Sequence, residues 1–332
     1  MKNLRISMLM IALFATGCST STPVVTNPTS PAPVPMDLPQ PTATPEPKGP
    51  VTPELFLEID SGPDPLKTPY GIALDSSGDI YVNDAGNSRV LVFDKAGTLL
   101  SKWDQPGGGE GAFTSLGFGG IAIDGSDHVF VVDNGNHRIQ KFDGTGKFLA
   151  QWGSEGTGDG QFVRLIGIAT NRDGNVYVTD DGNPFVQKFD NNGQFLMKWG
   201  GSGTGDGQFS HATGIAVDGQ GNVFVSDYEN KRVQKFNAQG EFMLAWTMGE
   251  DIGVTGIPEG IAVDAQGQVY ITDYLLGRMQ VFSNDGEFLW AWGVKSITKS
   301  LFKQPVGIAL DSNGHVYVVN QAGNNVQVFN LP

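Results

Sequence analysis

One short pattern occurs six times along the sequence, and this periodicity restricts the possible folds more than any other feature. The pattern is Gly-Ile-Ala followed by a variable residue and, in five copies, by Asp; the copies are spaced 49, 47, 47, 46 and 47 residues apart and begin at Gly71, Gly120, Gly167, Gly214, Gly260 and Gly307. Each copy continues as in "GIAVDGQGNVFVSDYENKRVQKFNAQGEFMLAW" (214–246), where short apolar segments alternate with turns. Four such segments in each repeat indicate four short strands of one antiparallel sheet.

A single small sheet of this kind cannot bury both of its faces. Several sheets arranged around an axis bury their faces against one another and leave no long exposed edges. The sequence therefore predicts an all-β fold, a six-bladed β-propeller with four-stranded antiparallel blades over residues 54–332. The 46 glycines agree with many short strands and tight turns.

The last blade lacks a strand in the order of the sequence. The sixth repeat supplies three strands and ends at "VQVFNLP" (326–332), whereas "ELFLEID" (54–60) precedes the first repeat and has no blade of its own. We predict that the N-terminal segment supplies the missing strand and closes the ring. Aligned on the "FLxxW" segments, Phe56 and Leu57 correspond to Phe148 and Leu149, and Asp60 takes the place of the Trp.

The repeat also resembles a known family. The consensus "GIAxDxxGxVYVxDxxNxRVQxF" followed by "GxFLxxWG" is similar to the NHL repeat, and "GSGTGDGQF" (201–209), echoed by "GSEGTGDGQF" (153–162), resembles the segment that joins blades in that family. The resemblance covers about residues 54–332 and implies a six-bladed propeller.

Residues 1–17 have the features of an export signal. Lys2 and Arg5 precede the apolar run "ISMLMIALFA", which is shorter than the ~20 residues of a membrane-spanning helix. Cys18 is the single cysteine, and "ATGC" resembles the lipobox of bacterial lipoproteins, in which the signal is cut before a lipid-carrying Cys; Ala15 stands where that family usually has Leu. The alternative is an ordinary signal peptide with an incidental cysteine.

The segment 18–53 that follows is rich in Pro and Thr. It holds eleven of the 19 prolines and almost no large apolar residues, so we expect a disordered linker behind the lipid-attachment cysteine. These features predict a protein of the bacterial cell envelope that is lipid-anchored outside the cytoplasm and contacts the membrane through its anchor alone.

The charge balance narrows the choice of partner. The chain has 21 Lys and Arg against 35 Asp and Glu, whereas binding along a phosphate backbone depends on clustered positive charge. We therefore expect no nucleic-acid partner. We expect a monomeric propeller with a protein, peptide or glycan ligand of the cell envelope.

One face of the propeller is the better place to search for a site. The loops between the second and third strands open there, together with the links that lead into each Gly-Ile-Ala. The residue before each repeat glycine should stand at the mouth of the central channel, a row consisting of Tyr70, Gly119, Ile166, Thr213, Glu259 and Val306. In the gluconolactonases and amidating lyases that this chain resembles, such positions present several carboxylates or histidines to a metal. This row has one carboxylate, so we expect no metal site and no cofactor.

Variable residues on the same face are the candidates for ligand binding. They are Tyr70, Phe118, Arg164, His211, Tyr228, Glu259 and Tyr274, and the same face also carries Phe185, Leu275 and Leu276. His211 is either a catalytic base or a solvated loop histidine. No complete catalytic set can be assembled from the sequence, so no catalytic residue is predicted.

Two regular features favour structural roles. An acid at the end of the second strand is followed five residues later by an arginine, in the pairs Asp84 with Arg89, Asp133 with Arg138, Asp227 with Arg232, and Asp273 with Arg278. We predict that these charges meet across adjacent strands. A Trp recurs near the end of the fourth segment in five repeats, and we predict that it packs between blades.

The sequence thus favours a binding or scaffolding module. Two alternatives remain open: a propeller enzyme of the lyase or lactonase type with its site at the channel mouth, and a purely structural component of the envelope.

Overall fold

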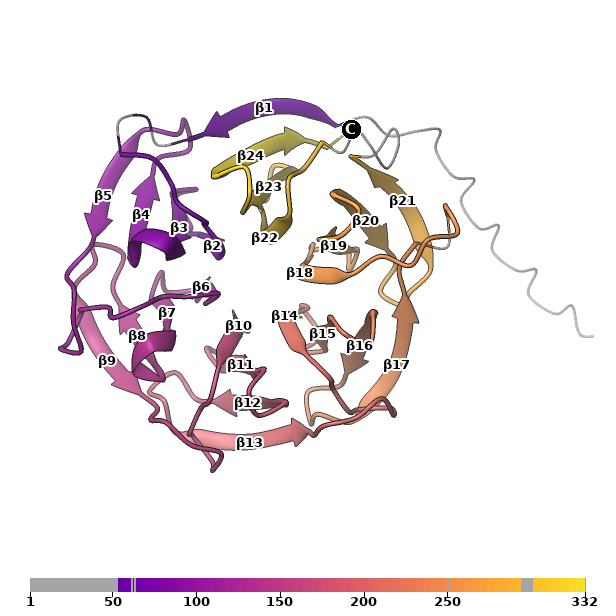
Figure 1. The fold of residues 1–332 in the computed structure, drawn as a ribbon, viewed down its shortest axis with the longest axis horizontal. Coiled ribbons are helices and arrows are strands. Elements are labelled where there is room, and N and C mark those ends of the chain that lie inside the picture. Colours follow the sequence, from indigo (N-terminus) through magenta and orange to yellow (C-terminus); the bar gives the residue numbers. More distant parts are fainter. Residues whose placement is uncertain (1–52, 61, 63, 250, 294–300, 332) are drawn as a thin grey trace, which may run out of the picture. The chain divides into compact units, whose positions relative to one another are not determined.

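The computed structural model describes residues 53–60, 62, 64–249, 251–293 and 301–331, and Figure 1 shows them as six four-stranded antiparallel sheets around a central axis. This arrangement confirms the predicted six-bladed β-propeller. The chain divides into two compact units, 1–45 and 46–332, and every described residue belongs to the second. The predicted signal peptide, Cys18 and the linker up to residue 52 therefore lie outside the described residues. Within the described part of the chain, no helix has the length and apolar character needed to cross a membrane.

In the first five blades the strands follow chain order from the channel outwards. They are β2 (Ile72–Leu74), β3 (Ile80–Asp84), β4 (Arg89–Phe93) and β5 (Leu99–Trp103); β6 (Ile121–Ile123), β7 (Val129–Asp133), β8 (Arg138–Phe142) and β9 (Phe148–Trp152); β10 (Leu165–Thr170), β11 (Val176–Asp180), β12 (Phe185–Phe189) and β13 (Phe195–Gly200); β14 (Ala212–Val217), β15 (Val223–Asp227), β16 (Arg232–Phe236) and β17 (Phe242–Thr247); and β18 (Pro258–Val263), β19 (Val269–Asp273), β20 (Arg278–Phe282) and β21 (Phe288–Trp292). Short 3-10 helices, η1 (Ala85–Asn87) and η2 (Asn134–Asn136), follow β3 and β7.

The sixth blade joins the two ends of the described chain. Its inner strands are β22 (Pro305–Leu310), β23 (His315–Asn320) and β24 (Asn325–Asn330), and its outermost strand is β1 (Glu54–Ile59). β1 pairs antiparallel with β24, as Figure 1 shows where the indigo and yellow ends of the colour scale meet. The prediction that the N-terminal strand closes the ring is confirmed.

The register of β1 differs by one residue from the alignment made on the sequence. Leu55 pairs with β24 as Phe148 pairs with β8, and Ile59 occupies the position that Trp152 has in the second blade. The alignment predicted from the sequence instead matches Phe56 with Phe148 and puts Asp60 in the Trp position, one residue later in each case. The observed register puts an apolar side chain in that buried position, whereas the predicted one would have desolvated a carboxylate.

The tryptophans pack between blades, as predicted. The ring of each of the five recurring tryptophans contacts a Phe at or next to the end of the third strand of the next blade, with centroids 5.2 to 6.3 Å apart in the pairs Trp103–Phe142, Trp152–Phe189, Trp199–Phe236, Trp246–Phe282 and Trp292–Phe329. At the closing seam, Ile59 and Phe93 share one hydrophobic cluster. The turns beneath the rings require glycine: a Cβ on Gly146, at φ +87°, would lie 2.4 Å from the Trp103 indole nitrogen.

Candidate functional site

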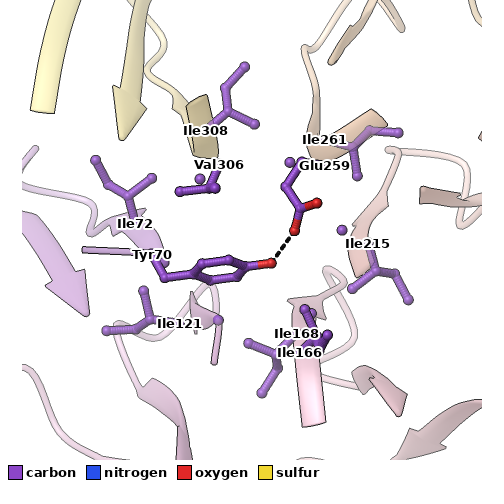
Figure 2. Close-up of a pocket in the computed structure, with 16 residues that line it drawn as sticks. Tyr70, Ile72, Ile121, Ile166, Ile168, Ile215, Glu259, Ile261, Val306 and Ile308 are labelled. Carbon is purple, nitrogen blue, oxygen red and sulfur yellow. Dashed lines mark hydrogen bonds between the residues drawn. The ribbon is translucent and has the colours of Figure 1, made fainter. Parts of the chain in front are cut away.

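The innermost strands leave a narrow apolar channel along the propeller axis. A cavity of about 90 Å³ is lined by the Gly-Ile pairs of the six repeats, and Figure 2 shows the isoleucines around it. The strands approach so closely that a Cβ on Gly214 would lie 2.2 Å from the carbonyl oxygen of Glu259. This close approach explains why every repeat has glycine at its first position.

Tyr70 and Glu259 meet at the mouth of this channel. The two residues come from different blades, and the Tyr70 hydroxyl donates a hydrogen bond to Glu259 Oε1 (Figure 2). Glu259 is only 6% exposed, and no Lys, Arg or His in the described part of the chain forms an ion pair with it. Burial raises the pKa of Glu259 to about 7, although the hydrogen bond from Tyr70 acts in the opposite direction. Burial, followed by the charge of Glu259, raises the pKa of Tyr70 well above its ordinary value.

A second cavity of about 150 Å³, here called the mouth pocket, adjoins this pair. Its lining residues are Tyr70, Phe118, Arg164, Ile166, His211, Tyr228, Glu259, Tyr274, Val306 and Gln321. The structure therefore brings together all seven candidates selected from the sequence. Phe185, Leu275 and Leu276 lie elsewhere and do not line this pocket.

Aromatic rings form much of the wall of the mouth pocket. The ring of Tyr70 lies 5.7 Å from that of Phe118, and Tyr228 contacts Tyr274 at 5.9 Å and His211 at 5.2 Å between centroids. Phe118 is 54% exposed, and Tyr228 and Tyr274 are half-buried. The Tyr228 and Tyr274 hydroxyls make no hydrogen bond to another described residue. Apolar surface and unused hydroxyl groups are thus available side by side.

An ion pair borders the other side of the pocket. The guanidinium group of Arg164 pairs with the carboxylate of Asp181, and His211 Nε2 lies 3.1 Å from Asp181 Oδ1. Burial and the nearby charge of Arg164 lower the pKa of His211, so the imidazole is mostly neutral at neutral pH. His211 is therefore held against Asp181 and Tyr228, and is not a freely solvated loop histidine.

Sequence reasoning missed two members of this site, Asp181 and Gln321. Both directly follow the last residue of the second strand in their blades, which is the repeat position that Tyr228 and Tyr274 occupy in blades four and five. Listing that position across all six repeats would have found them. Comparing repeat positions would not have found the ion pair between Arg164 and Asp181. Arg164 lies in the link that leads into the third blade, whereas Asp181 lies in the loop after the second strand of that blade.

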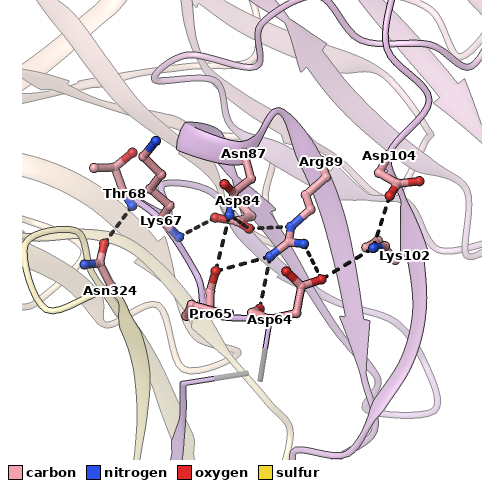
Figure 3. A network of polar contacts seen from close by, with 10 residues as sticks. All are labelled: Asp64, Pro65, Lys67, Thr68, Asp84, Asn87, Arg89, Lys102, Asp104 and Asn324. Carbon is pink, nitrogen blue, oxygen red and sulfur yellow. Dashed lines mark hydrogen bonds and ion pairs between the residues drawn. The ribbon is translucent and has the colours of Figure 1, made fainter. Parts of the chain in front are cut away.

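The carboxylates that end the second strands hold the links that carry the mouth residues. Figure 3 shows the first blade, where Asp84 Oδ1 accepts the Lys67 amide proton at 2.6 Å and Asp84 Oδ2 pairs with Arg89 Nε at 2.6 Å. Arg89 also donates to the carbonyl groups of Asp64 and Pro65. This network fixes the link that ends at Tyr70.

The same network recurs in other blades and confirms the predicted Asp–Arg pairs. The distances from Nε to Oδ2 are 2.8, 3.0 and 3.4 Å in the pairs Arg138–Asp133, Arg232–Asp227 and Arg278–Asp273. In the third blade, Asp180 has no arginine at the corresponding position and accepts the amide protons of Val163 and Arg164. The acids therefore position the links whether or not an arginine accompanies them.

The described residues include no group of three or more His, Cys, Asp or Glu side chains that could hold a metal ion. His128 and His315 contact Asp124 and Asp311 at 2.9 and 2.6 Å, in the turns that follow the innermost strands.

Comparison with known proteins agrees with this architecture. The NHL repeat family matches residues 66–93, 119–142, 209–236 and 302–329. The human NHL repeat-containing protein 3 is 41% identical over 51 residues, so the match spans only 15% of this chain and 15% of the human protein.

Among solved structures, the chain is similar to several propellers at low sequence identity. It matches the gluconolactonase XC5397 from Xanthomonas campestris with a TM-score of 0.59 and 18% identity, over 80% of this chain and 86% of that one. It matches a virginiamycin B lyase from Staphylococcus aureus with a TM-score of 0.60 and 11% identity, over 85% and 100% of the two chains. A streptogramin B lyase gives a TM-score of 0.58 and 14% identity, over 85% and 97%. At these identities the likeness shows the fold.

The blades, the closing strand and the pocket at the channel mouth define a six-bladed β-propeller. Four of its blades, the first, second, fourth and sixth, contain a segment that matches the NHL repeat.

Proposed function

We propose that this protein is a binding module whose mouth pocket takes up a protein, peptide or glycan ligand, and that lipid on Cys18 holds it in the cell envelope outside the cytoplasm. The main support is the gathering of partly exposed Tyr and Phe side chains at one pocket. The repeat pattern requires none of them, because other residue types occupy the same positions in other blades. Exposed aromatic residues around a concave site are typical of recognition surfaces.

Replacing Tyr228 and Tyr274 together by Ala tests the binding function. Because both side chains are half-buried and contact each other, we expect a loss of about 1 kcal/mol in the free energy of unfolding and a folded protein. Capture of envelope partners in a pull-down should fall strongly. Leu275→Ala is the matched control, since Leu275 is exposed next to Tyr274 but does not line the pocket. Unchanged capture by the folded double variant would refute the proposed site, and would leave a purely structural role as the simpler account.

The proposed anchor is tested by Cys18→Ser. Without the thiol no lipid can be attached, so the protein should leave the membrane fraction and its signal should remain uncut by the lipoprotein peptidase. Membrane fractionation and the mass of the mature N-terminus measure both effects. Retention in the membrane with normal processing would contradict the lipoprotein assignment.

A second candidate is a propeller enzyme of the lactonase or lyase type. The observation that favours it is the Tyr70–Glu259 pair, because a carboxyl group with a pKa of about 7 inside a pocket has the properties of a general acid or base. Turnover of lactones or of a streptogramin B, abolished by Glu259→Gln, would establish this activity. Elemental analysis of the purified protein would show whether the protein binds a divalent metal ion.

A further inference from the structure

Glu259 differs from the other buried carboxylates described above because, within the described residues, its carboxyl group has neither a cationic partner nor a backbone amide donor; Asp180, which also has no arginine, accepts two backbone amide protons. The Asp residues that end β3, β7, β15 and β19 each pair with an arginine, and Asp181 pairs with Arg164. Among the described residues, only the neutral Tyr70 hydroxyl donates a hydrogen bond to the carboxyl group of Glu259, which lines the mouth pocket. An ionised carboxylate buried in this way is stabilised when a cation approaches it. A cationic group of a ligand would reach Glu259 through the open side of the pocket.

The walls around Glu259 also suit a cation. Phe118, Tyr228 and Tyr274 line the same pocket, and the faces of aromatic rings attract ammonium groups. The pKa values of Tyr228 and Tyr274 are raised by burial and also by the charge of Glu259, which places both side chains within its electrostatic reach. A primary ammonium group has three donors. The carboxylate of Glu259 and the two unused hydroxyl groups offer acceptors for them.

The charges around the pocket leave a negative excess. Arg164 carries the positive charge of the lining residues, and Asp181 compensates it. His211 is mostly neutral at neutral pH because burial and Arg164 lower its pKa. When Glu259 is ionised, its charge is therefore uncompensated, and a ligand with a single positive charge would balance the site.

We propose that the mouth pocket recognises an alkylammonium group, and specifically the side chain of a lysine in a peptide or protein ligand. This inference rests on the proposed binding function and names the chemistry that the pocket selects. The ammonium group lies against Glu259, and the aliphatic stem of the lysine passes along Phe118, Ile166 and Val306, which line the same pocket. Lysine suits this arrangement because its stem packs on apolar surface while its charge lies at the tip.

The test compares two probes that differ only in the charge. Binding of Nα-acetyl-lysine methylamide and of Nα-acetyl-norleucine methylamide to the full chain is measured by calorimetry. We expect the lysine probe to bind at least ~10-fold more tightly, as a desolvated cation–π contact together with a charge-assisted hydrogen bond would give. Glu259→Gln should abolish the preference, since glutamine keeps an acceptor for the Tyr70 hydroxyl and loses the charge.

Glu229→Gln is the matched control for this variant. Glu229 follows Tyr228 at the same face but is exposed, so its removal changes the net charge equally without entering the pocket. It should leave the preference for lysine intact. Glucosamine and choline form two further arms, and tighter binding of either than of the lysine probe would overturn the assignment to a peptide lysine.

A pH series keeps the inference testable if Glu259→Gln does not fold. The affinity for the lysine probe should fall ~10-fold per pH unit below the pKa of Glu259, whereas that for the norleucine probe should not change. Tyr70, Tyr228 and Tyr274 stay protonated in this range because their pKa values are raised. His211, with its lowered pKa, gains charge only at lower pH. A series that runs from mildly alkaline pH to mildly acidic pH, through the pKa of Glu259, therefore reports on Glu259.

Equal binding of the lysine and norleucine probes by the parent protein would overturn the inference. If capture of the native partner still depended on Tyr228 and Tyr274, the proposed binding function would stand and only the ligand chemistry would be wrong. If neither probe bound and the double Tyr variant captured partners normally, both proposals would fail.

Discussion

At the scale of the residue, Glu259 links the structure of the propeller to its proposed function. Its backbone belongs to β18 and helps to line the channel, and its carboxyl group is buried at the channel mouth beside Tyr70. Five of the six repeats have another residue at this position, so the fold does not require a carboxyl group there. A buried acid that the fold does not require lowers stability once it is ionised, and this effect can be measured.

We predict that Glu259 makes the protein less stable as the pH rises from about 4.5 to about 7. Below the ordinary pKa of 4.5 the carboxyl group is protonated in both the folded and the unfolded states. Between the two pKa values only the unfolded state loses the proton, so the free energy of unfolding falls, by up to ~3 kcal/mol in total, and it stays low above the folded pKa. Glu259→Gln should remove this part of the pH dependence.

Denaturant melts of the parent, of Glu259→Gln and of Glu229→Gln, at mildly acidic and mildly alkaline pH, measure the effect. The Glu229 variant controls for a change in net charge at an exposed site. The same pH dependence in all three proteins would show that Glu259 ionises in the folded state as it does in water.

At the scale of the element, β1 shows how one strand joins the two ends of the propeller. Its outward side chains are largely exposed, and its last residue, Ile59, is 3% exposed at the seam with the first blade. Ile59 stands where the other blades have a Trp, and it packs in one cluster with Phe93 and Leu91 of the first blade. The closing strand therefore contributes to stability through its C-terminal end.

Ile59→Ala should destabilise the protein by about 2–5 kcal/mol, because it removes buried methyl and methylene groups at the seam and leaves a cavity. Leu55→Ala, on the same strand at a residue that is 48% exposed, should change the free energy of unfolding by less than ~0.5 kcal/mol. Urea denaturation of both variants provides the measurement. If Leu55→Ala cost as much as Ile59→Ala, the observed register of β1 would be wrong.

At the scale of the whole propeller, six separate seams hold the ring and all six blades contribute to one pocket. Each seam has its own hydrophobic cluster built mainly from two neighbouring blades. The mouth pocket collects Tyr70, Phe118, Arg164, His211, Glu259 and Gln321 from blades one to six in turn. Each blade thus contributes at least one residue, either from the last three positions before the repeat glycine or from the position after the second strand, and variation at these positions determines what the pocket can bind.

The sequence by itself determined the number of blades, the four strands of each blade, the ring closure and the face that carries the candidate residues. These features follow from the six-fold repeat and from the alternation of apolar residues, which are local properties of the chain. The seven candidates were found for the same reason, since the repeat register assigns each of them to one end of the channel.

Only the tertiary structure decided the register of β1 and the pairing of side chains across blades. The register depends on which residue of β1 fills the seam, and Ile59 does so because Asp60 would lose its hydration there. The contact of Tyr70 with Glu259 joins the first and fifth blades, so it depends on the distances and directions that the closed ring imposes. A repeat pattern places each residue within its own blade, whereas such contacts arise only when the blades are brought together around the axis.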